Sequence, residues 1–374
     1  MPEQAFGRPG ITTSANPMPG VLEVLFVHAD HTKAAAVAAV CANDFLGAVY
    51  TLPKNSQSTR ERALGRAVET HRAVAGPDAS VLFDADLYSG KNRVMGEHRL
   101  DPGWVAHQLN VGLSVACTDS GFIDDATPGQ LTSVLSQAAS LSQQRTGRVL
   151  TFLPLGGTWV TQRAEALRAQ IERHQVPVAL LLGGAQDPLS SKRAVEGLLH
   201  VLESEVPVSL LRTDMAAVGA LAAGATIAAF GTRSGLRHIY PIKKSKGGPP
   251  AGLPSVLVPQ SMSLHRLDTL AEAIADSPDG LHWICQCNLC YGRSLITIRS
   301  EEQAFGHNLS AAAEIARHVL DGLGRTKRLA SWGAMCGQAQ FVNFEIAATT
   351  NRRWDGPAYL GAWWGAGQLS FVGQ

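Results

Sequence analysis

The sequence has little of what marks several special classes of protein. Only 6% of its 374 residues are aromatic. Only 6 residues are cysteine, so the chain lacks the dense disulfide framework of small secreted domains. Lysine and arginine (32 together) almost balance aspartate and glutamate (31 together), which leaves a formal net charge of +1. No molecule-wide field therefore draws the chain to nucleic acid, and any contact with a polyanion must come from local patches.

Long hydrophobic runs are absent as well. No run of about 18 apolar residues predicts a membrane-spanning helix, and residues 1–20 lack the apolar segment of a signal peptide. Three cysteines, Cys41, Cys117 and Cys336, are scattered along the chain, which argues against disulfides. We therefore expect a cytoplasmic protein that does not associate with membranes.

Short apolar runs alternate with helical patterns through most of the chain. Hydrophobic residues make up 45% of the sequence, enough for a sizeable core. Helical periodicity is clear at 159–174 and 191–204. The runs predicted as buried strands are 21–27, 79–83, 113–117, 148–153, 177–182, 206–211 and 226–230. This repetition of strand and helix predicts a parallel sheet.

Either a (β/α)8 barrel or a doubly wound sheet would satisfy this pattern. Many of the predicted strands end in polar residues or glycines, namely Asp84, Asp119, Gly156–Gly157, Gly183–Gly184 and Asp214. In a barrel these ends meet on one face, where active sites lie. We therefore predict an α/β fold, a TIM (β/α)8 barrel with a C-terminal zinc-binding subdomain.

The zinc prediction comes from one cluster. Cys285, Cys287 and Cys290 form a Cys-x-Cys-x-x-Cys motif, and His307 follows close behind. Three thiolates and one imidazole complete a tetrahedral Zn²⁺ site and leave no position for water. The predicted role of the zinc is therefore structural.

The expected organisation has four parts. Residues 1–20 form a flexible N-terminus, 21–260 the barrel, and 261–330 the zinc-binding subdomain with a closing helix. Residues 331–374 form a C-terminal extension that holds four of the seven tryptophans. Tryptophans gathered in this way are typical of a core or a subunit interface.

The zinc segment, CQCNLCYGRSL at 285–295 followed by His307-Asn308-Leu309, resembles the zinc subdomain of tRNA-guanine transglycosylases. Members of that family are TIM barrels that break the N-glycosidic bond of a guanosine in nucleic acid and install a 7-deazaguanine base; a related branch acts on DNA. The resemblance runs in order from about residue 79 to 320, although the stretch between Cys290 and His307 is shorter than is usual in the family.

The resemblance implies roles for residues at the strand ends. Asp84 matches the family aspartate that contacts the base and assists proton transfer, with Asp86 as a substitute, and Asp119 matches a second base-recognising aspartate. Gly183 and Gly184 match a turn whose backbone lies against the base. Other residues that we expect to bind substrate are Tyr88, Gly156, Gly157, Arg233, Arg237 and His238.

The sequence departs from the family at two catalytic positions. The nucleophilic aspartate should fall between Ile227 and Phe230, but that segment reads IAAF, and no carboxylate lies between Asp214 and Asp268. The glutamine that reads the base is absent too, since Gly156 and its neighbours occupy that strand end. Covalent base exchange needs a carboxylate that attacks the anomeric carbon.

Two hypotheses stay open. The chain is either a base-exchange enzyme that uses Asp84 and Asp119, or a catalytically silent subunit that binds nucleic acid or pairs with an active homologue, as one eukaryotic family member does. Arg233, Arg237 and the lysines Lys243, Lys244 and Lys246 form a local cationic patch suited to the phosphates of tRNA or DNA. A homodimer or heterodimer is expected.

Overall fold

The computed structural model describes residue 18 and residues 20–54, 56–124, 127–242, 254–321 and 324–369. Of the expected flexible N-terminus, 1–20, only Met18 and Gly20 fall within this part of the chain. Lys243, Lys244 and Lys246 lie outside it.

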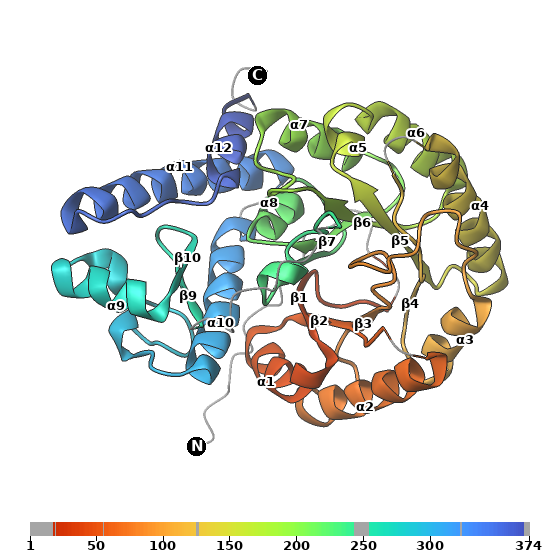
Figure 1. The fold of residues 1–374 in the computed structure, drawn as a ribbon, viewed down its shortest axis with the longest axis horizontal. Coiled ribbons are helices and arrows are strands. Elements are labelled where there is room, and N and C mark those ends of the chain that lie inside the picture. The colour runs from red at the N-terminus through yellow and green to blue at the C-terminus, as the bar shows by residue number, and fades with distance from the viewer. Residues whose placement is uncertain are drawn as a thin grey trace.

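Eight parallel strands form the centre of the molecule. Figure 1 shows them curved into a nearly closed barrel inside a ring of helices. The sheet order is β3-β2-β1-β8-β7-β6-β5-β4, and the two end strands, β3 and β4, contact each other. The strands are β1 (Leu25–Asp30), β2 (Gly47–Thr51), β3 (Val81–Asp84), β4 (Ala116–Cys117), β5 (Val149–Gly156), β6 (Val178–Gly183), β7 (Val208–Thr213) and β8 (Ala228–Gly231). The prediction of a TIM barrel is confirmed.

The strands are buried on both faces because successive side chains point to opposite sides of the sheet. On β1, Phe26 belongs to the cluster that fills the barrel, whereas Leu25 and Val27 pack in the cluster between the sheet and the helices. On β5, Leu150 and Phe152 fill the barrel in the same way. The core therefore has an inner part inside the barrel and an outer part under the helices.

Helices cover the outside of the barrel. They are η1 (His31–Lys33), α1 (Ala34–Asp44), α2 (Gln57–Ala75), α3 (Pro102–Asn110), α4 (Pro128–Gln144), α5 (Thr158–Thr161), α6 (Ala164–His174), α7 (Lys192–Val201), α8 (Ala216–Ala222) and η2 (Ser234–Leu236). The helix predicted at 159–174 is two helices, α5 and α6, with a break at residues 162–163. The strand β2 was not predicted, because GAVYT is short and follows directly on the end of α1.

The chain continues from the barrel into a smaller unit that holds the cysteines. It consists of β9 (Ser255–Val258), β10 (Ser263–Arg266), α9 (Leu267–Asp276), η3 (Leu281–Trp283), β11 (Ile284–Cys285), β12 (Arg293–Ser294), η4 (Leu295–Thr297) and α10 (Glu301–Leu320). Helix α10 packs against α1 and α8 of the barrel as well as against β9. It therefore joins this unit to the barrel.

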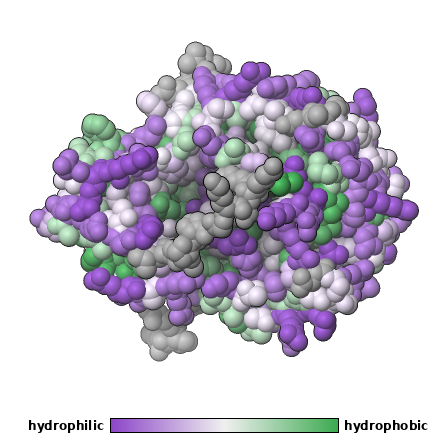
Figure 2. All heavy atoms as spheres, in the orientation of Figure 1, coloured by the Kyte–Doolittle hydropathy of each residue, from purple (hydrophilic) through white to green (hydrophobic). Residues whose placement is uncertain are grey.

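Two helices complete the described part of the C-terminus, α11 (Arg325–Thr350) and α12 (Tyr359–Leu369). They pack on each other, on α8 and on α7, and the rings of Trp332, Trp354 and Trp363 are buried. In the described chain, no helix combines the length and the apolar character needed to cross a membrane. Figure 2 shows mostly hydrophilic side chains on the visible face, with small hydrophobic areas between them.

Candidate functional sites: the barrel mouth and the cysteine cluster

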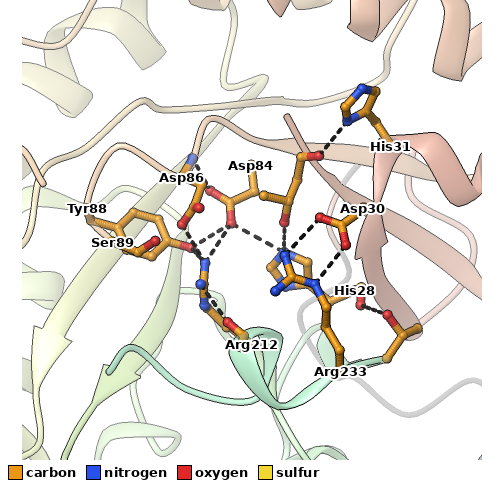
Figure 3. Close-up of polar contacts among 12 residues, drawn as sticks. His28, Asp30, His31, Asp84, Asp86, Tyr88, Ser89, Arg212 and Arg233 are labelled. Atoms are coloured by element: carbon orange, nitrogen blue, oxygen red, sulfur yellow. Dashed lines mark hydrogen bonds and ion pairs between the residues drawn. The ribbon is translucent and has the colours of Figure 1, made fainter. Parts of the chain in front are cut away.

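Three neighbouring strands each bring one polar side chain to the inside of the barrel at their carboxyl ends. His28, Thr51 and Asp84 stand two residues beyond the apolar inner residues of β1, β2 and β3, so strand alternation points them inward as well. The Nε2 atom of His28 lies 2.9 Å from the Thr51 hydroxyl. It also lies 3.3 Å from Oδ2 of Asp84 (Figure 3). These contacts tie three strands together at the mouth.

Arg212, at the end of β7, completes this mouth network from the opposite side of the barrel. Its Nη1 donates to Oδ1 of Asp86 at 2.7 Å and to the Tyr88 hydroxyl at 2.8 Å. The Tyr88 hydroxyl in turn donates to Oδ2 of Asp84 at 2.5 Å. Lys54 lies 3.2 Å from the other oxygen of Asp86 at the rim. The sequence-predicted residues Asp84, Asp86 and Tyr88 are thus brought together, as Figure 3 shows.

The backbone is strained at both ends of the central ion pair. Asp86 has φ of +50° and Arg212 has φ of +54°. Non-glycine residues rarely adopt this left-handed conformation, which costs on the order of 1–2 kcal/mol per residue. Strain of this kind persists only where the surroundings fix the conformation, here the buried contacts that the two side chains make.

The network also determines which groups are charged. Burial alone would raise the pKa of Asp84, but the hydrogen bond and charge of His28, together with the charge of Arg212, hold that pKa below its ordinary value. Burial raises the pKa of Tyr88 well above its ordinary value. At neutral pH Asp84 is therefore a carboxylate and Tyr88 a neutral phenol, so Asp84 has no proton to give to a leaving base.

The mouth network is closed to solvent in the described structure. The exposed fractions of His28 and Asp84 are both 0%, that of Tyr88 is 1% and that of Arg212 is 5%. None of the five best-formed cavities in the described chain is lined by these four residues. Because Asp84 has no exposed surface, it cannot contact a nucleobase in this conformation.

The glycines expected to contact a base face protein atoms instead. A Cβ added to Gly183 would lie 3.1 Å from the Phe122 ring and 3.3 Å from the carbonyl oxygen of Ile239. Ile239 pairs with Gly183 as a short extra strand. One added to Gly157 would lie 3.1 Å from the carbonyl oxygen of Gly183, and Gly156 is buried within β5. A Cβ added to Gly184 would lie 2.8 Å from the carbonyl oxygen of Gln186. The predicted glycines are thus packed against other parts of the barrel.

Asp119 lies apart from Asp84 in its contacts. It follows β4 and is 4% exposed. Its Oδ1 accepts from the backbone N–H of Asp101 at 3.0 Å, and its Oδ2 lies 3.2 Å from Nε2 of His98. The hydrogen bond that His98 donates to Asp119 raises the pKa of His98. Through these contacts Asp119 joins the β3–α3 connection to the end of β4. Its contacts are therefore those of a structural residue.

The predicted cationic patch is divided among different surroundings. Arg233 is paired with Asp30 through two bonds of 2.7 and 2.9 Å (Figure 3), which neutralises its charge. Arg237 is partly buried and donates to the carbonyl of Gly231 at 3.3 Å. His238 is buried, and burial lowers its pKa to about 4, so it is uncharged.

The segment where the family nucleophile would lie is apolar and buried. Exposed fractions from Ile227 to Phe230 run from 0% to 6%. Ala229 pairs with Phe26 inside the barrel, and Gly231 is the β8 residue level with His28. No carboxylate therefore reaches the mouth from β8.

The sequence reasoning missed a second cationic feature, a groove between α1 and α2. It has a volume of about 570 Å³ and is lined by His31, Arg62 and Arg66 together with three threonine hydroxyls. No carboxylate lines it, and neither arginine forms an ion pair with another described residue. Arg62 and Arg66 are four residues apart on α2, so they lie side by side.

The cysteine cluster is built as the motif predicts. Cys285, Cys287 and Cys290 lie on the β11–β12 hairpin and His307 on α10, and all four are buried. Their potential ligand atoms lie within 4.8 Å of one another, so together they could hold a metal ion. Nδ1 of His307 faces the thiols, 3.7 Å from Cys287 Sγ and 3.2 Å from Cys290 Sγ.

These separations fit a tetrahedral ion. Zn–S bonds of about 2.3 Å and Zn–N bonds of about 2.0 Å imply an S–N separation of about 3.5 Å, which lies between the two observed distances. The other ring nitrogen of His307, Nε2, lies 2.8 Å from the carbonyl oxygen of Leu257 on β9. Donation to that carbonyl fixes the tautomer and leaves the Nδ1 lone pair directed at the thiols.

Comparisons with known proteins found only distant structural likenesses. No protein-family model and no curated protein matches the sequence. The YdjI aldolase from Escherichia coli K12 aligns over 78% of this chain and 88% of its own at 12% identity, with a TM-score of 0.36. An enolase from Sargasso Sea environmental sequencing aligns over 62% of this chain at 12% identity, with a TM-score of 0.33, and the match spans only 57% of that enolase.

A truncated 3-deoxy-D-arabino-heptulosonate 7-phosphate synthase from Thermotoga maritima aligns over 58% of this chain and 81% of its own. Its identity is 10% and its TM-score 0.34. Likenesses at this level carry no inference about activity.

Proposed function

We propose that this chain is a transglycosylase-like protein that binds nucleic acid and is catalytically silent in base exchange. The observation that supports it best is the closed mouth network. Asp84, which matches the family's base-contacting aspartate, is fully buried, and its carboxylate is paired with Arg212 and His28. No carboxylate takes the place of the nucleophile on β8, and covalent exchange requires one.

We propose further that the cysteine cluster holds one structural Zn²⁺. Three buried thiols and an oriented imidazole make up a complete ligand set, and soft thiolate ligands favour zinc over magnesium or calcium. The bound ion would tie the β11–β12 hairpin to α10. Because thiolates bind metal only when reduced, this proposal supports a cytoplasmic location.

Binding to nucleic acid is supported by the groove between α1 and α2. Its two arginines have no carboxylate partner in the described chain, and the groove lies beside η1, which follows β1 at the mouth. Unpaired guanidinium groups on an acid-free surface suit phosphates. The chain would then present tRNA or DNA to an active homologue with which it pairs as a subunit, and that partner would handle the 7-deazaguanine base.

A second candidate is base exchange by this chain itself. The observation in its favour is that an ionised carboxylate, Asp84, stands at the carboxyl end of a barrel strand, the position of catalytic groups in TIM barrels. The mouth would then have to open around Tyr88 and Arg212.

The test of the binding proposal is a salt titration. Fluorescently labelled RNA hairpins and DNA strands would be titrated with the protein at several salt concentrations, for the wild type and for Arg62→Ala/Arg66→Ala. We expect binding at low salt, and a log–log slope reduced by roughly 1.4–1.8 in the variant, because two phosphate contacts are lost. Arg352→Ala/Arg353→Ala removes the same charge from two arginines that are already paired with carboxylates, so it should leave the slope unchanged.

Two results would count against the proposal. Absence of binding to either RNA or DNA at low salt removes the nucleic-acid function altogether. Equal slopes for the groove variant and its charge-matched control would show that nucleic acid binds elsewhere. The lysines Lys243, Lys244 and Lys246 would then be the next candidates for the binding site.

A further inference from the structure

A cavity of about 260 Å³ lies where the barrel meets the cysteine-bearing unit and the C-terminal extension. The β7–α8 connection, strand β8, the β9–β10 hairpin, α10 and residues 355–359 all contribute to its wall. Most of the wall is apolar, formed by side chains such as Phe230, Leu257, Met262, Phe305 and Leu309. It is distinct from the mouth network, because none of His28, Asp84, Tyr88 or Arg212 lines it. A concave, mainly apolar wall with a few polar groups is the usual form of a small-molecule site.

Most of the polar side chains in the wall already have partners. Asn308 uses both amide atoms on the backbone of β9, at 2.7 and 2.8 Å. The Ser263 hydroxyl lies 2.6 Å from that of Ser261, and the Tyr359 hydroxyl donates to the carbonyl of Met262 at 3.1 Å. These groups shape the cavity and have little left to offer a ligand.

Three charged side chains line the wall, and one of them, Asp355, is exposed and paired with Arg353 at 2.5 Å. The other two, Asp214 and Arg237, still have capacity for hydrogen bonds. One oxygen of Asp214 accepts the N–H of Ala216 at 2.9 Å, at the start of α8, and the other oxygen has no described partner. Arg237 donates through Nε to Gly231 at 3.3 Å. Its terminal nitrogens make no ion pair with the described residues, Asp214 included. The cavity therefore offers the free oxygen of Asp214 as an acceptor and the terminal nitrogens of Arg237 as donors.

We propose that this cavity binds a small, uncharged cyclic amide, whose N–H donates to the free oxygen of Asp214 and whose carbonyl oxygen accepts from Arg237. Such a ligand matches one acceptor and one donor at once, and its ring body fills the apolar remainder. The proposal rests on the cavity alone and not on the proposed nucleic-acid function.

Charged ligands fit less well. Burial and the charge of Asp187 raise the pKa of Asp214 to about 7, so at neutral pH the cavity carries only part of that negative charge and holds a cation weakly. An anion would satisfy Arg237 but would leave Asp214 facing a second negative group. A neutral amide avoids both costs, because it brings no charge into the apolar cavity.

The test uses probes of matched size measured by isothermal titration calorimetry at pH 8. They are 2-quinolone, N-methyl-2-quinolone, which keeps the carbonyl but lacks the N–H, 2-naphthoate and 2-naphthamidine. We expect 2-quinolone to bind most tightly and its N-methyl form to bind at least about tenfold more weakly, since the buried carboxylate is left unpaired.

Two variants locate the contact. Asp214→Asn keeps the hydrogen bond to Ala216 and should weaken 2-quinolone about tenfold. The control is Asp101→Asn, another aspartate that accepts a helix-start N–H, at 2.8 Å on α3, and it should change nothing. The proposal is overturned if 2-quinolone does not bind, if the N-methyl form or a charged probe binds as well, or if Asp214→Asn binds it unchanged. The probe comparison on the wild type stands even if the variant folds poorly.

Discussion

Replacing Arg212 by methionine removes the central cation of the mouth network while keeping an unbranched side chain of similar length. The change abolishes the bonds to Asp86 (2.7 Å), Tyr88 (2.8 Å) and the carbonyl of Gly235 (2.7 Å). It leaves the buried carboxylate of Asp84 with only His28, Tyr88 and the backbone as partners. Removing one partner of a buried ion pair costs about 3–5 kcal/mol, a large part of the roughly 5–15 kcal/mol by which proteins are stable.

The assay is urea unfolding at pH 7 and 25 °C for Arg212→Met, Asp86→Asn and the double variant. Because the two side chains contact each other directly, the double variant should lose at least about 1 kcal/mol less than the sum of the single losses. Arg353→Met removes an arginine whose ion pair with Asp355 is 89% and 68% exposed, and it should have no measurable effect. A loss under about 1 kcal/mol for Arg212→Met, or full additivity, would refute the reasoning.

The pH dependence gives a second measure of the same perturbation. The pKa of Asp84 is lower in the folded protein than its ordinary value. Its stabilising contribution is therefore complete above the unfolded pKa of about 3.9 and is lost as the pH falls through the folded value. Without the charge of Arg212 the folded pKa rises, so Arg212→Met should begin to lose stability at a higher pH than the wild type.

Three further predictions concern the rest of the chain. Cys287→Ser should lower the zinc content measured by mass spectrometry from one ion per chain and reduce the melting temperature, as should chelation of the wild type, whereas Cys41→Ser, at a buried thiol outside the cluster, should retain the zinc. Burial raises the pKa of Asp214 to about 7, so the stability contributed by its protonated form should be complete below about pH 4 and fall by about 4 kcal/mol up to pH 8; urea unfolding of Asp214→Asn should not show that fall. Changing the three lysines at 243–246 together to alanine should weaken nucleic-acid binding and flatten its salt dependence, with little loss of stability.

The parts of this molecule that follow from local pattern could be predicted from the sequence. The strand–helix alternation gave the barrel, and the spacing of Cys285, Cys287 and Cys290 gave the cluster, because each depends on residues close together in the chain. His307 was found because it follows the cysteines closely, but the helix expected to open there begins earlier, at Glu301, so that His307 lies within α10. Strand β2 was missed because five residues without clear alternation carry too weak a signal.

The mouth network could not be predicted because it depends on distant segments. Arg212 and Asp86 are 126 residues apart in the chain, and nothing in either segment indicates that they pair. A signal did exist, since His28 and Arg212 each interrupt an apolar strand at its carboxyl end. Their partners, and the packing of Phe122 and Ile239 against Gly183, follow only from the three-dimensional fold.

The central claim, that the barrel mouth is closed and lacks a nucleophile, is tested most directly by intact-mass spectrometry. The protein would be incubated with guanine-containing RNA and DNA, with and without a 7-deazaguanine base, and then denatured and weighed. We expect the unmodified mass in every case. A covalent nucleic-acid adduct mapped to Asp84, Asp86 or Asp119 would contradict it and establish base exchange by this chain, and an adduct between Ile227 and Gly231 would show that the assignment of the nucleophile segment is wrong.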